Sequence, residues 1–351
     1  MGLHIAMKTF LAILCLSGCL LFSETSKGQT GSGRAEVLRF GFYNAENYFD
    51  PYVDSASVYH EFDPGGDRHW TVQRYAAKRQ HVFKVVAAMG GWQGMDVMAF
   101  AEIENRFVLD DLLKNTPLGE KNYGIVHFES PDHRGIDVGL IYKKSAFSPL
   151  YSRAIRVYDS TGKLLKTRDI LYVKGRVGAD TIHLFINHWP SRYGGLMATV
   201  SKRLLVSRIL LRVVDSVCVH NKNARILIFG DFNEPLSGKG LQYLLRAGKK
   251  CRLSALQPHW DFGLTQGTIR GKEGWAIFDR VFCSKNFLSA GEPVLVDDKS
   301  FHIFDAPFLL ENDKKKLGLK PNRTYAGYAY HGGFSDHLPV YVNVVIKEAG
   351  K

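Results

Sequence analysis

The sequence predicts a layered α/β fold, with one β-sheet packed on another and helices on the outside. Segments that alternate between apolar and polar residues, as strands do, are interspersed with segments of helical periodicity. The composition is that of an ordinary globular chain, 45% hydrophobic and 23% charged. No long Pro, Gly or Ser run and no internal repeat divides the 351 residues. We therefore expect one large domain after an N-terminal leader.

The N-terminus has the features of an export leader. Lys8 precedes an apolar run over residues 10–22, which is too short to span a bilayer comfortably and has the size of a signal-peptide core. Residues 26–28 offer a signal peptidase small residues, whereas residues 16–19 resemble a lipobox in which Cys19 would carry a lipid anchor. Both alternatives predict export, as a periplasmic protein, an outer-membrane lipoprotein or a secreted protein.

The domain boundaries follow from this leader. We assign residues 1–28 to the signal peptide or lipoprotein leader, residues 29–36 to a disordered linker and residues 37–348 to the folded domain.

Helices are predicted where apolar residues recur at helical spacing. Residues 70–89 have this spacing, and Gly90-Gly91 ends it. Residues 200–219 form a second long stretch, and residues 107–113 a short one.

Strands are predicted for short apolar or alternating runs. In chain order they cover residues 37–43, 96–101, 138–142, 181–187, 226–229, 276–282 and 340–345.

Polar residues follow several of these apolar runs directly. The residues in question are Asn44, Glu102, Asn187-His188, Asp231 and Asp279. Rigid strands aim the side chains at their ends into one crevice, so we expect these residues to share a site. Asp336-His337 precedes the last predicted strand and supplies two more groups suited to metal binding or acid–base chemistry.

The cysteines argue against a disulfide framework and against a zinc site. Only Cys218, Cys251 and Cys283 lie beyond the leader, and they lack C-x-x-C spacing. At most one bridge can form, and a role as small buried residues is favoured.

The net charge of +12 attracts polyanions such as nucleic acid or anionic lipid surfaces. Charge of this sign does not by itself identify a substrate.

Six short motifs resemble one family, the endonuclease/exonuclease/phosphatase superfamily of DNase-I-like phosphoesterases. In chain order they are FYNAEN (42–47), AEIEN (101–105), NHWPSR (187–192), GDFNEP (230–235), FDRVF (278–282) and SDHLPV (335–340). The resemblance runs from about Arg39 to Val345, and GDFN followed by SDH is its most specific part. It implies a four-layer sandwich of two mixed sheets flanked by helices, with residues 37–348 as the catalytic domain.

The resemblance also implies roles for individual residues. Glu102 would be the principal metal carboxylate, helped by Asn44 and Asp336, and Glu46 stands where some relatives have a second metal carboxylate. Asp231 and Asn233 would handle the attacking water and a phosphate oxygen. His188 and His337, the latter oriented by Asp279, would contact the scissile phosphate.

Two arginines are weaker candidates for phosphate contacts. Arg134 lies on a loop entering a strand, where an ion pair with Asp137 is an equal alternative. Arg192 follows His188 in its motif.

The chemistry of these residue types agrees with the implied activity. Carboxylate and amide oxygens suit Mg²⁺ or Mn²⁺, which neutralise the charge that develops when hydroxide attacks an anionic phosphodiester. An imidazole paired with a buried carboxylate is favoured as imidazolium. Either Asp231 or His337 could serve as the general base.

We expect a divalent-metal-dependent phosphodiester hydrolase, favour an exported nuclease of low sequence specificity, and infer no stable protein partner. The alternatives are a phosphatase or phospholipid phosphodiesterase, acting on inositol phosphates or sphingomyelin, and a non-catalytic binding protein. The segments 51–68 and 290–330 are local elaborations. The first leads into the first long predicted helix, and we expect the second to overhang the pocket and shape substrate choice.

Overall fold

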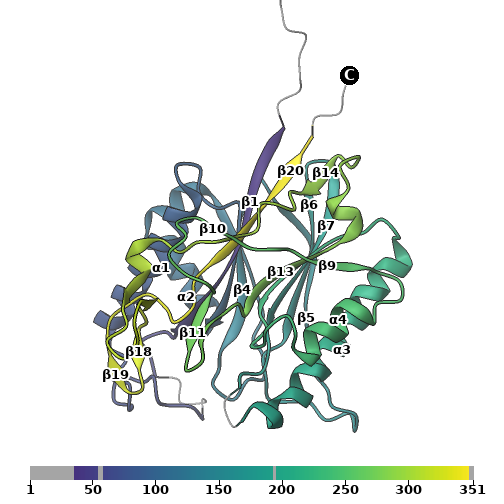
Figure 1. Ribbon diagram of the computed structural model, residues 1–351. Coiled ribbons are helices and arrows are strands. Elements are labelled where there is room, and N and C mark those ends of the chain that lie inside the picture. The colour runs from purple at the N-terminus through teal and green to yellow at the C-terminus, as the bar shows by residue number, and fades with distance from the viewer. Residues whose placement is uncertain (1–34, 54–57, 193–194, 348–351) are drawn as a thin grey trace, which may run out of the picture. The chain divides into compact units, whose positions relative to one another are not determined.

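The computed structural model describes residues 35–53, 58–192 and 195–347 (Figure 1). The predicted leader, with its proposed lipid anchor Cys19, lies outside these residues. Within the part that is described, no helix combines the length and apolar character needed to cross a membrane.

The described part contains two large sheets, four α-helices and three small hairpins. The first sheet has the strand order β10 (His259–Trp260), β15 (His302–Ile303), β20 (Val340–Ile346), β1 (Glu36–Tyr48), β2 (Val97–Ile103), β4 (Asp137–Lys143) and β3 (Tyr123–His127), with β14 (Val294–Val296) also paired to β20. The second has the order β5 (Ser148–Ile155), β6 (Ile170–Val177), β7 (Asp180–His188), β8 (Arg225–Asp231), β13 (Asp279–Ser284) and β9 (Leu253–Ala255). The hairpins pair β11 (Ile269–Gly271) with β12 (Gly274–Ala276), β16 (Leu310–Asn312) with β17 (Leu319–Pro321), and β18 (Tyr325–Ala326) with β19 (Ala329–Tyr330).

The helices cover the outer faces of the two sheets (Figure 1). α1 (Val72–Gly90) and α2 (Arg106–Lys114) lie on the side of the first sheet, and α3 (Leu196–His220) and α4 (Lys239–Arg246) on the side of the second. The helix predicted over 70–89 is therefore confirmed, and Gly91, with a φ of 56°, ends it because glycine adopts a left-handed backbone without a steric penalty.

Strand β8 shows how the layers form from a two-residue period. Leu227 and Phe229 belong to the core between the sheets, whereas Ile226 and Ile228 pack in a second core beneath α3 and α4. Both faces of the strand are buried, which explains its uninterrupted apolar sequence. The predicted layered α/β fold, in its four-layer form, is confirmed.

The prediction of one strand over 276–282 is wrong in detail. Ala276 ends the small strand β12, whereas β13 begins only at Asp279. Apolar residues on both sides of the junction concealed the change of partner strand.

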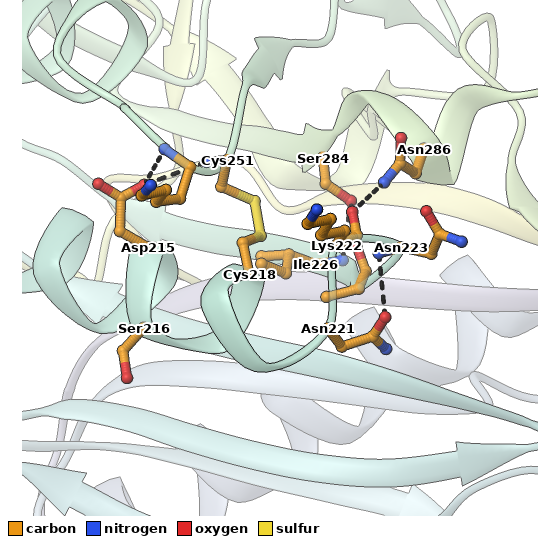
Figure 2. The surroundings of a disulfide bond; sticks show 12 residues. Asp215, Ser216, Cys218, Asn221, Lys222, Asn223, Ile226, Cys251, Ser284 and Asn286 are labelled. Atoms are coloured by element: carbon orange, nitrogen blue, oxygen red, sulfur yellow. Dashed lines mark hydrogen bonds between the residues drawn. A yellow bond between two sulfur atoms is a disulfide. The ribbon is translucent and has the colours of Figure 1, made fainter.

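Of the two alternatives for the cysteines, the single bridge does form, and the favoured role of a small buried residue without a bridge applies to Cys283 alone. Cys218 on α3 forms a disulfide with Cys251, and Cys283 is free and buried (Figure 2). Asp215, one turn before Cys218, accepts hydrogen bonds from the backbone N–H groups of Lys250 and Cys251, each at 3.1 Å. This contact holds the segment against the helix, and nothing in the sequence over the separation of 33 positions between the cysteines indicates it.

Candidate active site

The site lies where strand ends from both sheets meet. The parallel pairs β1–β2 and β7–β8 end there, and the antiparallel strand β13 begins there, so Asp279 stands opposite Asp231 in the strand register. The side-chain amide of Asn44 donates to Asp231 Oδ2 at 3.1 Å and so links the first sheet to the second. The strand ends that the sequence singled out therefore do converge.

The backbone is distorted at this edge. Four site residues adopt left-handed conformations, Glu46, Asn47, Glu102 and Asn233, with φ values of 48°, 56°, 57° and 51°. The strand register of β1 with β2 shifts after Asn44. Such conformations cost about 1 kcal/mol or more each for residues with a Cβ, and they occur where a strand must aim a side chain out of its regular direction.

Asp231 is at the centre of the site. Its Oδ1 accepts from Asn233 N at 2.9 Å, and its Oδ2 lies 3.6 Å from His188 Nε2 and 3.7 Å from His337 Nε2. Burial is the main cause that raises the pKa of Asp231 to about 7, against the opposing charge of His337.

The two histidines of the site, His188 and His337, differ in charge. Burial lowers the pKa of His337, but Asp279, whose Oδ2 is 2.7 Å from His337 Nδ1, and Asp231 outweigh it and hold this pKa well above its usual value. Burial and the charge of Arg168 lower the pKa of His188 well below its usual value. At neutral pH, His337 is an imidazolium and His188 a neutral imidazole.

Two carboxylates, Glu102 and Asp336, border an open cavity. Glu102 Oε2 accepts from Asn47 N at 3.0 Å and lies 3.4 Å from Arg134 Nη2, while Asp336 Oδ2 lies 2.9 Å from Arg323 Nη2. Burial alone would raise both pKa values, but these arginines outweigh it and lower them. Both groups are therefore charged, which suits a hard divalent cation.

Glu46 is engaged within the protein. Its Oε1 accepts from Arg323 at 3.0 and 3.2 Å, and its Oε2 accepts from Thr324 N at 2.7 Å. Burial, with the charge of Asp336, raises the pKa of Glu46 to about 7. Arg323 thus bridges two of the predicted metal carboxylates, and Asn44 likewise uses its amide oxygen to accept from Glu46 N at 3.0 Å.

A metal ion fits two places in this site. One ligand atom each of Asp231, Asp279 and His337 lies within 4.8 Å of the others. There, however, the imidazolium of His337 already supplies the positive charge and its Nδ1 is engaged by Asp279. Glu102 and Asp336 offer charged oxygens at the edge of the cavity, so they fit a divalent ion better.

The cavity beside Glu102 has a volume of about 460 Å³. Its described lining is Glu46, Asn47, Tyr59, Glu61, Phe62, Arg68, Glu102, His133, Arg134, Arg168, Ser191, Tyr328 and Asp336. Arg134 lines it and pairs with Glu102, so the alternative pairing of Arg134 with Asp137 is wrong. Asp137 instead bonds His127 Nε2 at 3.0 Å.

Arg192 lies beside the site but is held by its neighbours. Its Nε donates to the carbonyl oxygen of Asn233 at 3.1 Å, and its guanidinium stacks 4.5 Å over the ring of Phe278.

Two arginines of the site, Arg168 and Arg323, were not predicted from the sequence. Arg168 donates to the carbonyl oxygen of Trp189 at 2.7 Å and pairs with Asp132 at 3.1 Å. Arg323 lies in the segment 290–330, for which no residue was proposed as part of the site. Neither stands in one of the six motifs, and no local pattern in the sequence marks them.

Comparisons with known proteins identify the family and the fold. A family model described as the endonuclease/exonuclease/phosphatase family matches residues 39–346. A search of curated proteins finds no significant match.

Three solved structures share the fold. A Bacteroides thetaiotaomicron protein of the endonuclease/exonuclease/phosphatase family is 13% identical, with a TM-score of 0.58 over 90% of this chain and 100% of that one. A mannosyl-6-phosphatase from the same organism is 13% identical, with a TM-score of 0.56 over 88% and 100%. TDP2 of D. rerio, complexed with a single-stranded DNA product, is 15% identical, with a TM-score of 0.51 over 88% and 98%.

Proposed function

Because this chain belongs to the endonuclease/exonuclease/phosphatase family and is a hydrolase of phosphate esters, we propose that it works with a divalent metal ion held by Glu102 and Asp336. The single observation that carries this proposal is the pair of charged carboxylates at the mouth of the cavity, beside the triad of Asp231, Asp279 and His337. Mg²⁺ or Mn²⁺ suits such oxygen ligands, and when bound it would supply positive charge to the phosphate.

The protein side chains then divide the remaining work. His337, held as an imidazolium by Asp279, donates a hydrogen bond from Nε2 to a phosphate oxygen. A protonated imidazole has no lone pair with which to accept a proton, so we assign the general base to Asp231. Asn233 orients Asp231, since its Nδ2 lies 3.2 Å from Asp231 Oδ2. His188 packs against the same carboxylate as a neutral hydrogen-bond partner for the substrate.

Two classes of substrate are candidates. The net charge of +12 supports a nuclease of low sequence specificity, and a fold neighbour was solved with a DNA product. A phosphatase or phospholipid phosphodiesterase is the alternative, and another fold neighbour is a mannosyl-6-phosphatase.

We also propose that the protein is exported. The apolar leader supports this, and so does the Cys218–Cys251 disulfide, because disulfides persist mainly in oxidising compartments. Fractionation of cells that express the full chain, with and without residues 1–28, tests export. A Cys19→Ser variant tests the lipid anchor. Equal retention in the cytoplasm with and without the leader would refute export.

The catalytic proposal is tested by offering the full chain plasmid DNA, RNA, bis(p-nitrophenyl) phosphate, inositol phosphates and sphingomyelin. Each is assayed with Mg²⁺, Mn²⁺, Ca²⁺ or EDTA. We expect Glu102→Ala and His337→Ala to abolish hydrolysis. Glu292→Gln, a change outside the cavity at a carboxylate that pairs with Arg225, should leave it intact. Turnover that survives EDTA, or that is unchanged in Glu102→Ala, would refute the mechanism.

A further inference from the structure

We infer that the far side of the cavity is a subsite for an uncharged ring attached to the scissile phosphate. The enzyme would then hydrolyse small phosphate esters that carry one phosphate and one ring, and not internal bonds of a long polymer. This inference rests on the proposed function and narrows its substrate class.

The far wall consists of two segments that are distant in sequence. One is the stretch from Val58 to Trp70, and the other is the β18–β19 hairpin. Arg68 joins them, because its guanidinium lies 5.5 Å from the ring of Phe62 and 4.6 Å from that of Tyr328.

Further contacts fix this wall in place. Arg68 donates to the carbonyl oxygen of Gly327, and Tyr325 donates through its hydroxyl to the carbonyl oxygen of Arg68 at 2.8 Å. The ring of Phe62 stacks on Phe49 at 4.3 Å and packs edge-on against Trp70 at 5.9 Å. The wall is therefore attached to the hydrophobic core through Phe62 and Tyr325.

The wall presents aromatic rings to the cavity. Tyr59, Phe62 and Tyr328 line it, and 62% of the Tyr328 surface is exposed. Aromatic faces bind the flat or apolar face of a sugar or a base. The volume of about 460 Å³ falls within the usual range for small-molecule sites. The cavity therefore suits a phosphate beside Glu102 and a single ring against the aromatic wall.

The charges in the cavity are matched to one phosphate. Each lining arginine already has a carboxylate partner: Arg68 pairs with Glu61, Arg134 with Glu102, and Arg168 with Asp132. A divalent ion adds positive charge for the scissile group. Among the described lining residues, no unpaired guanidinium or ammonium group remains for a second phosphate. A nucleic acid strand would bring one phosphate for every nucleotide, and this wall offers them no partner.

The test measures kcat/KM of the full chain with Mg²⁺ on matched substrates. The ring-bearing monoesters are a hexose 6-phosphate, a nucleoside 5′-monophosphate and phenyl phosphate, and glycerol phosphate lacks the ring. A hexose bisphosphate adds a second phosphate, and closed circular plasmid has only internal bonds. We expect kcat/KM for at least one ring-bearing monoester to be about tenfold or more above kcat/KM for glycerol phosphate, for the bisphosphate and for a plasmid bond. The hexose and nucleoside arms then show which ring is preferred.

Tyr328→Ala probes the subsite directly, and the exposure of this residue makes a folding defect easy to exclude by thermal unfolding. We expect KM for the preferred ring substrate to rise about tenfold, the equivalent of one lost stacking contact, while glycerol phosphate changes less than twofold. Tyr151→Ala is the matched control, since Tyr151 is 54% exposed and lines a different cavity.

The ring subsite and the proposed function would be overturned by different results. Glu102-dependent nicking of plasmid that is faster than turnover of every ring monoester would overturn this inference and leave the proposed function standing. An equal effect of Tyr328→Ala on ring and non-ring substrates would also overturn the subsite. Absence of Glu102-dependent hydrolysis of every phosphate ester would overturn the proposed function itself.

Discussion

His183 should make the folded protein sensitive to acid. It lies on β7, buried, with its Nδ1 2.8 Å from the Tyr172 hydroxyl and with Lys174 opposite it in the strand register. Arg153 and His220 line the same cavity of about 420 Å³, and its described lining includes no carboxylate. Burial, with the charge of Lys174, lowers the pKa of His183 from 6.5 to about 4. The described lining of this cavity therefore supplies no negative charge that would stabilise an imidazolium.

The sign and size of the effect follow from proton linkage. Between pH 4 and 6.5 the unfolded chain binds a proton at this residue and the folded chain does not, so stability falls as the pH falls through this range. Evaluated for the two pKa values, the loss between pH 7 and pH 5 is about 2 kcal/mol.

Urea unfolding of the wild type and of His183→Gln at pH 7 and pH 5 measures this term. Other groups also titrate, so we compare how much the free energy of unfolding changes from pH 7 to pH 5 in each protein. The difference between these two changes isolates His183, because the cost of the substitution itself is the same at both pH values and cancels. Between pH 7 and pH 5 we expect the free energy of unfolding to fall by about 2 kcal/mol less in His183→Gln than in the wild type. His220→Gln changes an exposed residue of the same cavity and should show the same fall as the wild type. Equal losses in His183→Gln and the wild type would refute the reasoning.

Three further predictions concern the active site and the disulfide. Asp279→Asn removes one of the two carboxylates that hold the His337 pKa high, so an NMR titration should show this pKa lowered, with kcat reduced about 10³-fold; an unchanged His337 pKa would contradict this. Arg323→Met leaves Glu46 and Asp336 without their shared cation, so titration calorimetry should show two bound Mn²⁺ ions where the wild type binds one, and unaltered stoichiometry would count against it. Cys218→Ser removes the disulfide, which closes a loop between positions 33 apart in sequence, so urea unfolding should show the free energy of unfolding reduced by about 3 to 4 kcal/mol. Cys283→Ser breaks no disulfide and should not show this reduction.

Local periodicity in the sequence determined most of the architecture. The short apolar run at residues 226–229 and the helical spacing over 70–89 are local patterns, and they indicate a buried strand and a helix whatever the rest of the chain does. The polar residues at strand ends could be predicted to converge for the same reason. The structure brings Asn44, Asp231, His188, Asp279 and His337 together as that pattern indicates.

Only the tertiary structure decided how those residues are employed. The bridge from Arg323 to Glu46, the clamp from Arg68 to Gly327 and the Cys218–Cys251 disulfide join segments that are 277, 259 and 33 residues apart. The left-handed backbone at Glu46 and Glu102 likewise persists because packing on all sides holds it against its intrinsic cost. Local preferences extend over a few residues, whereas these contacts depend on the simultaneous packing of both sheets. The sequence therefore determined the strands and the chemical groups at their ends, and the packing of the whole domain determined the charge, the partner and the cavity of each group.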